Sequence, residues 1–193
     1  MLRIVGVRRL PVVLLCFAMG LAADLGYHVP EPTGVRKPIG RLLATRPLSR
    51  LNRRILGPTD RLFNRLSRGK VTFSGLGGYP PLWVTVVGAR SGAPRTVPLL
   101  GIPIDDDIAL IGSSFGQEKT PAWVHNLEAN PEATVSFEGR EVEVRARPAT
   151  PDEAQSVWRK ASAIYPGYGY YAERAAHRRV RVFLLEGGGD QSD

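Results

Sequence analysis

The chain has 193 residues, 43% of them hydrophobic and 23% charged, an ordinary globular composition that excludes extensive disorder. A single cysteine, Cys16, excludes an intrachain disulfide framework or a cysteine-rich metal centre, and three widely spaced histidines argue against a metal hydrolase. Residues 1–70 carry 14 Lys and Arg against three acidic residues, whereas residues 71–193 carry 12 against 15. A basic N-terminal third before a mildly acidic domain favours an anionic membrane surface over a nucleic acid as partner.

Residues 1–23 form a leader in which Arg3, Arg8 and Arg9 precede an uncharged run over 10–23. The pattern is typical of a secretory signal, and the run is short for a membrane-spanning helix, which needs ~20 residues. A cleaved signal, a membrane anchor, an over-extended gene start and a buried helix of the domain all fit it. The leader is therefore compatible with the cytoplasmic face of a membrane, with the cytoplasm, or with export if it is a signal peptide.

Residues 24–70 are predicted to form a basic linker and amphipathic helices. The first part, 24–47, contains several prolines and has no periodicity, which is typical of a linker. Over 51–66, apolar residues recur at helical spacing with arginines between them, and Gly57-Pro58 is expected to split the stretch into two short helices. The resulting basic amphipathic surface suits either anionic lipid or packing on the domain with its arginines in solvent.

The core domain is predicted over residues 71–187, with a flexible tail over 188–193. Six strands are expected, over 82–87, 96–104, 108–111, 134–137, 141–146 and 180–185. Helices are expected from an N-cap at Thr120 to residue 129, and from a capping box at Thr150 to residue 164. Hairpin-linked strands with helices at the side indicate an α+β fold, mainly β, built as a small and partly open antiparallel barrel.

Two segments of this domain combine glycines with polar side chains. The loop over 88–95 carries Arg90, Ser91 and Arg95 between glycines, and it is either a cradle for a phosphate or carboxylate or a plain turn with solvated arginines. Residues 112–120 leave a strand and enter a helix, so their small hydroxyl residues can hydrogen-bond a planar ring or serve only as a connection.

The following helix and a tyrosine-rich loop supply two further candidates. Core packing accounts for Trp123 and Leu127 at i, i+4, whereas Asn126 is available to cap a loop or touch a ligand. Four of the six tyrosines lie within 165–171, where they would wall a pocket for a flat substrate or cover one end of the barrel. No nucleophile with a paired base stands out, so an enzyme of this sequence would rely on a cofactor.

Taken together, these segments resemble the deazaflavin (coenzyme F420)-dependent nitroreductase family. The similarity rests on the pattern GARSGxPRTxPL from Gly88, KTPxWxxNLxANP from Lys119, YPxYxxY from Tyr165, and the closing VFLLE from Val182. It covers residues 75–187. The resemblance implies a split β-barrel, similar to FMN-binding barrels, that binds coenzyme F420 through its deazaflavin ring, phosphate and oligoglutamate tail.

The resemblance also implies a role for individual residues. The phosphate and tail would be held by Arg90, Ser91 and Arg95, and Ala89 of the same loop would also lie at the cofactor. The rest of the coenzyme would lie along Thr96, Val97, Pro98, Leu99, Leu100, Ile111, Gly112, Ser113, Ser114, Ala122, Trp123, Val124, His125 and Asn126. The implied catalytic residues are Ser113, Tyr165, Tyr168 and Tyr171, with the tyrosines as a substrate lid and Tyr168 also at the cofactor. No metal is implied.

The implied activity is hydride transfer from reduced coenzyme F420, an 8-hydroxy-5-deazaflavin, to a small flat acceptor such as a quinone or nitroaromatic. The protein would contribute orientation, and a tyrosine or Ser113 would hydrogen-bond the accepting oxygen. Family members commonly have a basic residue at the position of Ala89, and some at that of Ser114, so this chain is expected to hold the tail less tightly. The alternatives are an FMN-using split-barrel reductase, a non-catalytic deazaflavin or flavin carrier, and a basic adaptor acting through residues 1–70.

Overall fold

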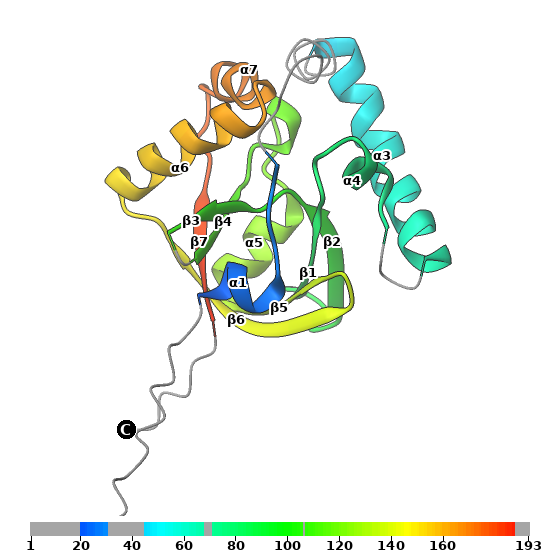
Figure 1. Ribbon diagram of the computed structural model, residues 1–193. Helices are drawn as coiled ribbons and strands as arrows, with labels where there is room; N and C mark the ends of the chain where they lie inside the picture. Colours follow the sequence, from blue (N-terminus) through cyan, green and yellow to red (C-terminus); the bar gives the residue numbers. More distant parts are fainter. Residues whose placement is uncertain (1–19, 31–44, 68–70, 106, 188–193) are drawn as a thin grey trace, which may run out of the picture.

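The computed structural model describes residues 20–30, 45–67, 71–105 and 107–187, so most of the predicted leader and the whole predicted tail lie outside the described residues. Figure 1 shows a curled sheet with helices around it. The strands, all antiparallel, are β1 (Leu82–Val87), β2 (Pro94–Leu99), β3 (Ile102–Ile104), β4 (Asp107–Ile111), β5 (Glu132–Phe137), β6 (Arg140–Pro148) and β7 (Val182–Gly187). The helical elements are α1 (Leu21–Leu25), α3 (Arg46–Leu66), α4 (Phe73–Leu76), the 3-10 turn η1 (Ser114–Gly116), α5 (Ala122–Ala129), α6 (Pro151–Ile164) and α7 (Gly167–Arg174). The predicted α+β class and antiparallel barrel are confirmed.

The sheet curls because its two edge strands are consecutive in the chain. The strand order is β2-β1-β5-β6-β7-β4-β3, so β2 and β3 lie at opposite edges although only Leu100 and Gly101 separate them. That link is three Cα steps of ~3.8 Å each, so the two edges must approach one another and the sheet becomes a half-barrel. The single strand predicted over 96–104 is therefore wrong, and seven strands replace the six expected.

Tyr27 holds the point where the chain passes from β2 to β3. Its buried hydroxyl oxygen accepts a hydrogen bond from the Gly101 N–H at 3.1 Å. Its single proton faces two carbonyl oxygens, that of Gly101 at 3.0 Å and that of Pro80 at 3.1 Å. A Cβ at Gly101 would lie 2.7 Å from Leu82 Cδ1, so the crossing requires glycine. Burial, the main cause, raises the pKa of Tyr27 far above its usual range, so the phenol remains a donor.

The barrel core includes residues that the sequence analysis assigned to the leader and linker. Leu21 and Leu25 of α1 are buried, and Tyr27 packs edge-on against Phe137 with ring centroids 5.0 Å apart. The linker predicted over 24–47 is therefore wrong for its described beginning, and the folded unit includes chain well before residue 71. Burial of Leu21 and Leu25 is what holds α1 against the barrel.

Helix α3 is continuous where two short helices were predicted. Pro58 lies inside the helix although it lacks an N–H for the helical hydrogen bond. Beside it, the Thr59 hydroxyl donates an additional hydrogen bond to the Ile55 carbonyl. Asp60 anchors α3 to α4, because its buried carboxylate accepts hydrogen bonds from the Ser74 N–H at 2.8 Å and from the Ser74 hydroxyl. No helix of the described residues is both long and apolar enough to cross a membrane.

Helices α6 and α7 cover the outer face of β3, β4 and β7. The predicted capping box of α6 is confirmed, with the Thr150 side chain accepting from the Glu153 N–H and the Glu153 side chain accepting from the Thr150 N–H. Several boundaries differ from the prediction by one or two residues; for example, α5 has Pro121 as its N-cap instead of Thr120, and the last strand begins at Val182. The tyrosine-rich segment is mostly helix, α7. Burial of Tyr168 and Tyr171 on one face, at i, i+3, favours the helix over a loop.

Candidate active site

The loop between β1 and β2 is an ordered turn that exposes two arginines. The Gly88 N–H donates to the Ala93 carbonyl at 2.9 Å, and the Gly92 N–H donates to the Gly88 carbonyl at 2.8 Å. Gly92 has φ +64°, and a Cβ at Gly88 would lie only 3.0 Å from the Ala93 carbonyl oxygen, so the turn favours glycine at both positions. Arg90 and Arg95 are exposed, and within the described part of the chain neither is paired with a carboxylate. Both guanidinium groups are thus available to an anion.

Helix α5 holds this loop through Asn126. The Oδ1 atom of Asn126 accepts a hydrogen bond from the Ala89 N–H at 3.0 Å. Trp123 and Leu127 are buried in the barrel core, as predicted, and Ala122 is exposed. His125 points to the surface beside Glu128, with its Nδ1 3.3 Å from Glu128 Oε2. Of the polar side chains of α5, Asn126 is therefore the one that organises the loop.

The loop after β4 lies against the same helix. Gly112 packs so closely on α5 that a Cβ would lie 2.8 Å from Val124 Cγ2. Ser113 is buried, and Ile111 before it is also buried. Val124 and Asn126 both belong to α5, so this one helix contacts both the small-residue loop and the arginine loop.

This second loop adopts a strained backbone. Ser114 and Phe115 have φ +50° and +56°, and Gly116 follows with φ +73°. A left-handed conformation costs a residue with a side chain about 1–2 kcal/mol, so the surrounding contacts must hold it. The Phe115 and Tyr171 rings meet with centroids 5.8 Å apart, and a Cβ at Gly116 would lie 3.3 Å from Tyr171 Cα. Strain of this kind is common at binding sites.

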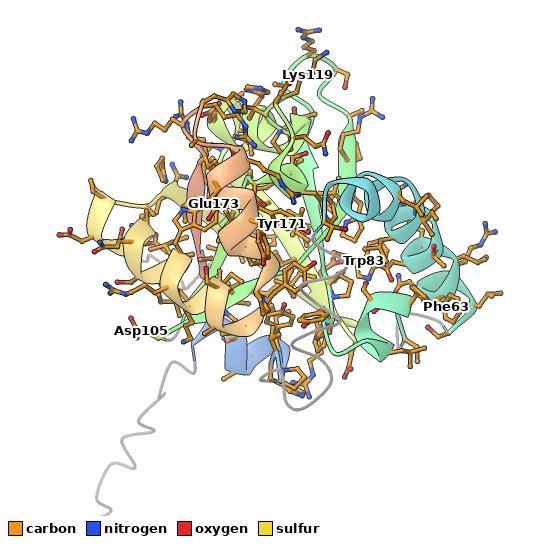
Figure 2. All side chains as sticks on the ribbon, turned by 90° about the horizontal axis from the view of Figure 1, so that it is seen from above. Phe63, Trp83, Asp105, Lys119, Tyr171 and Glu173 are labelled. Carbon is orange, nitrogen blue, oxygen red and sulfur yellow. The ribbon has the colours of Figure 1, made fainter. Side chains whose placement is uncertain are left out.

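The three tyrosines that were predicted to form a substrate lid form a packed cluster. Tyr168 and Tyr171 are buried and Tyr165 is half-buried, and Figure 2 places Tyr171 near the middle of the molecule. The Tyr165 and Tyr171 hydroxyl oxygens lie 3.2 Å apart. Burial, the largest cause in each case, raises the pKa of all three phenols, so they remain protonated near neutral pH and can act as donors.

Strand β2 runs from the arginine loop toward the tyrosine cluster. Thr96 is exposed and its hydroxyl lies 2.8 Å from that of Thr85, while Val97, Pro98, Leu99 and Leu100 are half-buried. Leu100 packs against the cluster that contains Tyr168 and Tyr171. As an edge strand, β2 has one side unpaired in the described sheet. The residues of this stretch that were predicted for the cofactor thus lie between the arginine loop and the tyrosine cluster.

Arg178 is a residue of this region that the sequence analysis missed. Its guanidinium donates to the carbonyl oxygens of Gly112, Ser113 and Gln117 at 3.0, 3.0 and 3.2 Å, and its Nη1 atom is buried without a partner among the described residues. The sequence offered no signal, because Arg178 is one of three arginines within four positions. Only the fold distinguishes it from its exposed neighbour Arg179.

Two hollows occur away from these residues. One, of about 60 Å³, lies between α4 and the barrel and is lined in part by Trp83 and Phe137. The other, of about 540 Å³, is an open groove between α6 and α7 lined in part by Trp158. Neither hollow is lined by the arginine loop or by Ser113, so neither belongs to the candidate site.

The residues present suit a flat ligand with an anionic tail. The unpaired Arg90 and Arg95 match a phosphate or carboxylate tail. In the loop after β4, Gly112 and Ser113 are buried, so the half-buried Ser114 and Phe115 are the residues that a planar ring could contact. A curled antiparallel barrel that unites these features on one helix is a split β-barrel of the cofactor-binding class.

Comparison with known proteins gives the family. The family model of the F420H(2)-dependent quinone reductases matches residues 60–187, and the chain belongs to this family. The F420H(2)-dependent quinone reductase Rv1261c of Mycobacterium tuberculosis is 29% identical over 89 residues, which are 46% of this chain and 60% of that protein. The putative quinone reductase Rv3178 of the same organism is 28% identical over 106 residues, 55% of this chain and 88% of that protein. The chain thus spans about three fifths of the first of these relatives.

Solved structures agree with the fold. A structure described as an F420-H2 dependent reductase (FDR-A) is 31% identical with a TM-score of 0.51, covering 55% of this chain and 94% of that one. Another, described as a domain-swapped dimer, is 30% identical with a TM-score of 0.53, covering 67% and 99%. The resemblance to deazaflavin-dependent enzymes and the split barrel are therefore confirmed.

Proposed function

We propose that this protein is an oxidoreductase that binds reduced coenzyme F420 and reduces a small quinone. The observation that carries the proposal is that one helix, α5, contacts both the arginine loop, through Asn126, and the Gly112–Ser113 loop, through Val124. When bound, the deazaflavin supplies the hydride. The protein supplies an anion cradle, a surface for the ring and donors for the acceptor.

Each part of the site has a distinct task. Arg90, Ser91 and Arg95 hold the phosphate and the acidic tail by charge-assisted hydrogen bonds. The loop that begins at Gly112 receives the ring, with Ser113 buried and Ser114 half-buried at the ring. Holding ring and acceptor in one geometry is the main catalytic contribution, because orientation lowers the entropic part of the barrier.

The tyrosines serve the acceptor. A quinone that accepts a hydride develops negative charge on its oxygen, and a neutral phenol can donate a hydrogen bond to it. Tyr165 is the most accessible of Tyr165, Tyr168 and Tyr171 and is hydrogen-bonded to Tyr171. Tyr165 therefore contacts the acceptor, while Tyr168 and Tyr171 hold its ring in place.

The N-terminal third supports an anionic membrane surface as partner. Seven of the nine large apolar side chains that are exposed in the described residues fall within residues 51–76. On α3, the exposed Leu51, Ile55, Leu62 and Leu66 lie within about 60° of one another at 3.6 residues per turn. Such an apolar stripe on a basic helix is typical of a surface that lies in a membrane interface.

The charge around this stripe selects the kind of membrane. Residues 45–76 hold eight basic residues and one acidic residue, Asp60, which is turned inward to Ser74. Arg61 and Arg65 are exposed beside the stripe. Figure 1 shows α3 along the outside of the barrel, and α3 also contacts β2 and η1. We therefore propose attachment to the cytoplasmic face of an anionic membrane, with the site close to lipid-soluble quinones.

A cofactor titration tests the function. The full chain is titrated with oxidised and reduced coenzyme F420 and with FMN, followed by fluorescence, and then assayed with a quinone and a nitroaromatic. Binding of coenzyme F420 but not of FMN, followed by quinone reduction, is the expected result. Binding of FMN with turnover would identify a flavin-using reductase, and tight deazaflavin binding without turnover would identify a carrier. Binding of neither cofactor would contradict the proposal.

A further inference from the structure

Arg178 connects the two ends of the loop that faces the proposed ring site. Its Nη2 atom donates to the carbonyl oxygens of Gly112 and Ser113, and its Nε atom donates to that of Gln117. These carbonyls flank the strained residues Ser114 and Phe115. One guanidinium group therefore fixes both sides of the strained turn.

The contacts of Arg178 are unusual for a structural arginine. Within the described part of the chain no carboxylate pairs with it, and the hydrogen bonds of its guanidinium go to the backbone of this loop. Burial lowers the pKa of its guanidinium, which reflects a cation surrounded by dipoles without a counter-charge. Arg178 is half-buried, and desolvating its charge without a carboxylate partner costs free energy. The role of Arg178 should therefore lie in what it positions.

The segment that carries Arg178 also carries the acceptor-side tyrosines. Arg178 follows α7, and its N–H donates to the Ala175 carbonyl at 3.0 Å, while Tyr171 of α7 packs on Phe115 in the middle of the loop. The loop is therefore held in the middle by Tyr171 and at both ends by Arg178. Cofactor and acceptor sides are joined in one short stretch of chain.

We propose that Arg178 is a positioning residue for the coenzyme, acting through the fork geometry of its guanidinium on the Gly112–Gln117 loop. The inference rests on the proposed function, because it takes that loop as the surface that receives the ring. The three carbonyl acceptors lie before and after the strained turn, at Gly112, Ser113 and Gln117. A planar, branched guanidinium can donate to all three, and the compact ammonium of lysine lacks this shape. The shape of the side chain, beyond its charge, is what the site needs.

The test compares Arg178→Lys and Arg178→Gln with Arg179→Gln, a charge-matched control at the exposed neighbouring position. Both Arg178 variants are expected to raise the Kd for oxidised coenzyme F420 about tenfold or more, because the loop loses its fixed backbone, whereas the control stays within about twofold. Hydrogen exchange of the coenzyme-free proteins is the second readout. The Gly116 and Gln117 N–H groups should exchange faster in the Arg178 variants, while those of β1 and β5 are unchanged.

The outcomes separate the inference from the proposed function. Failure of the wild-type protein to bind the coenzyme would contradict the proposed function, and hydrogen exchange would then still decide whether Arg178 holds the loop. Wild-type affinity in Arg178→Lys would overturn the inference, because charge alone would suffice. Unchanged loop exchange would also overturn it, and so would loss of the folded state in both variants, which would make Arg178 a general structural residue.

Discussion

Asn126 accepts a hydrogen bond from the backbone N–H of Ala89 at 3.0 Å, across 37 positions of sequence. The bond fixes the arginine loop to the helix that also carries Val124 against Gly112. One helix therefore contacts both the arginine loop and the small-residue loop.

Replacing Asn126 should weaken coenzyme binding more than it destabilises the fold. Asn126→Leu keeps the size of the side chain but removes the acceptor, so the loop loses its anchor and the Kd for coenzyme F420 should rise about three- to tenfold. Gln155→Leu, which removes an exposed amide on α6, is the control. Equal affinities of Asn126→Leu and the wild type would show that the loop keeps its position without this bond.

Reversing the charge of Arg95 should abolish coenzyme binding in a folded protein. The exposed guanidinium has no carboxylate partner in the described chain, so Arg95→Glu breaks no ion pair but repels an acidic tail. Fluorescence titration measures binding, and circular dichroism checks the fold. Arg159→Glu, on the exposed side of α6, makes the same charge change and should bind normally. Normal binding by Arg95→Glu would remove the arginine loop from the site.

Removing one hydroxyl from the barrel closure should lower stability. Tyr27→Phe leaves the Gly101 N–H buried without its acceptor, which costs about 1–3 kcal/mol in free energy of unfolding. Urea denaturation measures the change, with Tyr170→Phe at an exposed position as control. An unchanged urea midpoint for Tyr27→Phe would mean that the closure does not depend on this phenol.

The ion pair between Arg147 and Glu153 should stabilise the protein in a pH-dependent way. Arg147 donates to both carboxylate oxygens, at 2.9 and 2.8 Å, and this is the main reason that the pKa of Glu153 falls from 4.5 to about 2. Because the pKa is lower in the folded state, the stabilisation is complete above the unfolded value and is lost as the pH falls through about 2.

The Tm difference between wild type and Glu153→Gln should therefore be largest near neutral pH and shrink below the ordinary pKa of 4.5. Glutamine still accepts the capping hydrogen bond from the Thr150 N–H, so the variant isolates the charge. Glu143→Gln, exposed on β6, should show no such trend. A Tm difference that is constant with pH would contradict the assignment.

A charge on the apolar stripe should release the protein from membranes. Leu62→Asp removes the transfer of one leucine into the interface, worth about 1.5–3 kcal/mol, and should lower binding to vesicles of phosphatidylcholine and phosphatidylglycerol at least tenfold. Vesicle flotation measures binding, and Tyr170→Ser removes an exposed ring outside the stripe as the control. Equal binding of the wild-type protein to neutral and anionic vesicles would show that the arginines do not attract it to the membrane. Binding to neither kind of vesicle would contradict membrane attachment.

The sequence by itself determined the local features that neighbouring residues control. Strand alternation, the Thr150 capping box and the glycines of the arginine loop depend on periodicity and on backbone freedom, so they could be predicted without the fold. The motif order from Gly88 to Tyr171 also sufficed to indicate the family and, through the resemblance, the cofactor.

The tertiary structure alone decided how distant segments meet. The barrel closes at Gly101 because Tyr27, 74 positions earlier, takes over its backbone hydrogen bonds, and no local pattern around either residue encodes that contact. The tyrosine segment becomes a helix because α6 buries one of its faces. Arg178 differs from Arg179 because its guanidinium donates hydrogen bonds to three carbonyl oxygens. Each of these depends on long-range packing, whose energy is realised only when the partner segments are already in place.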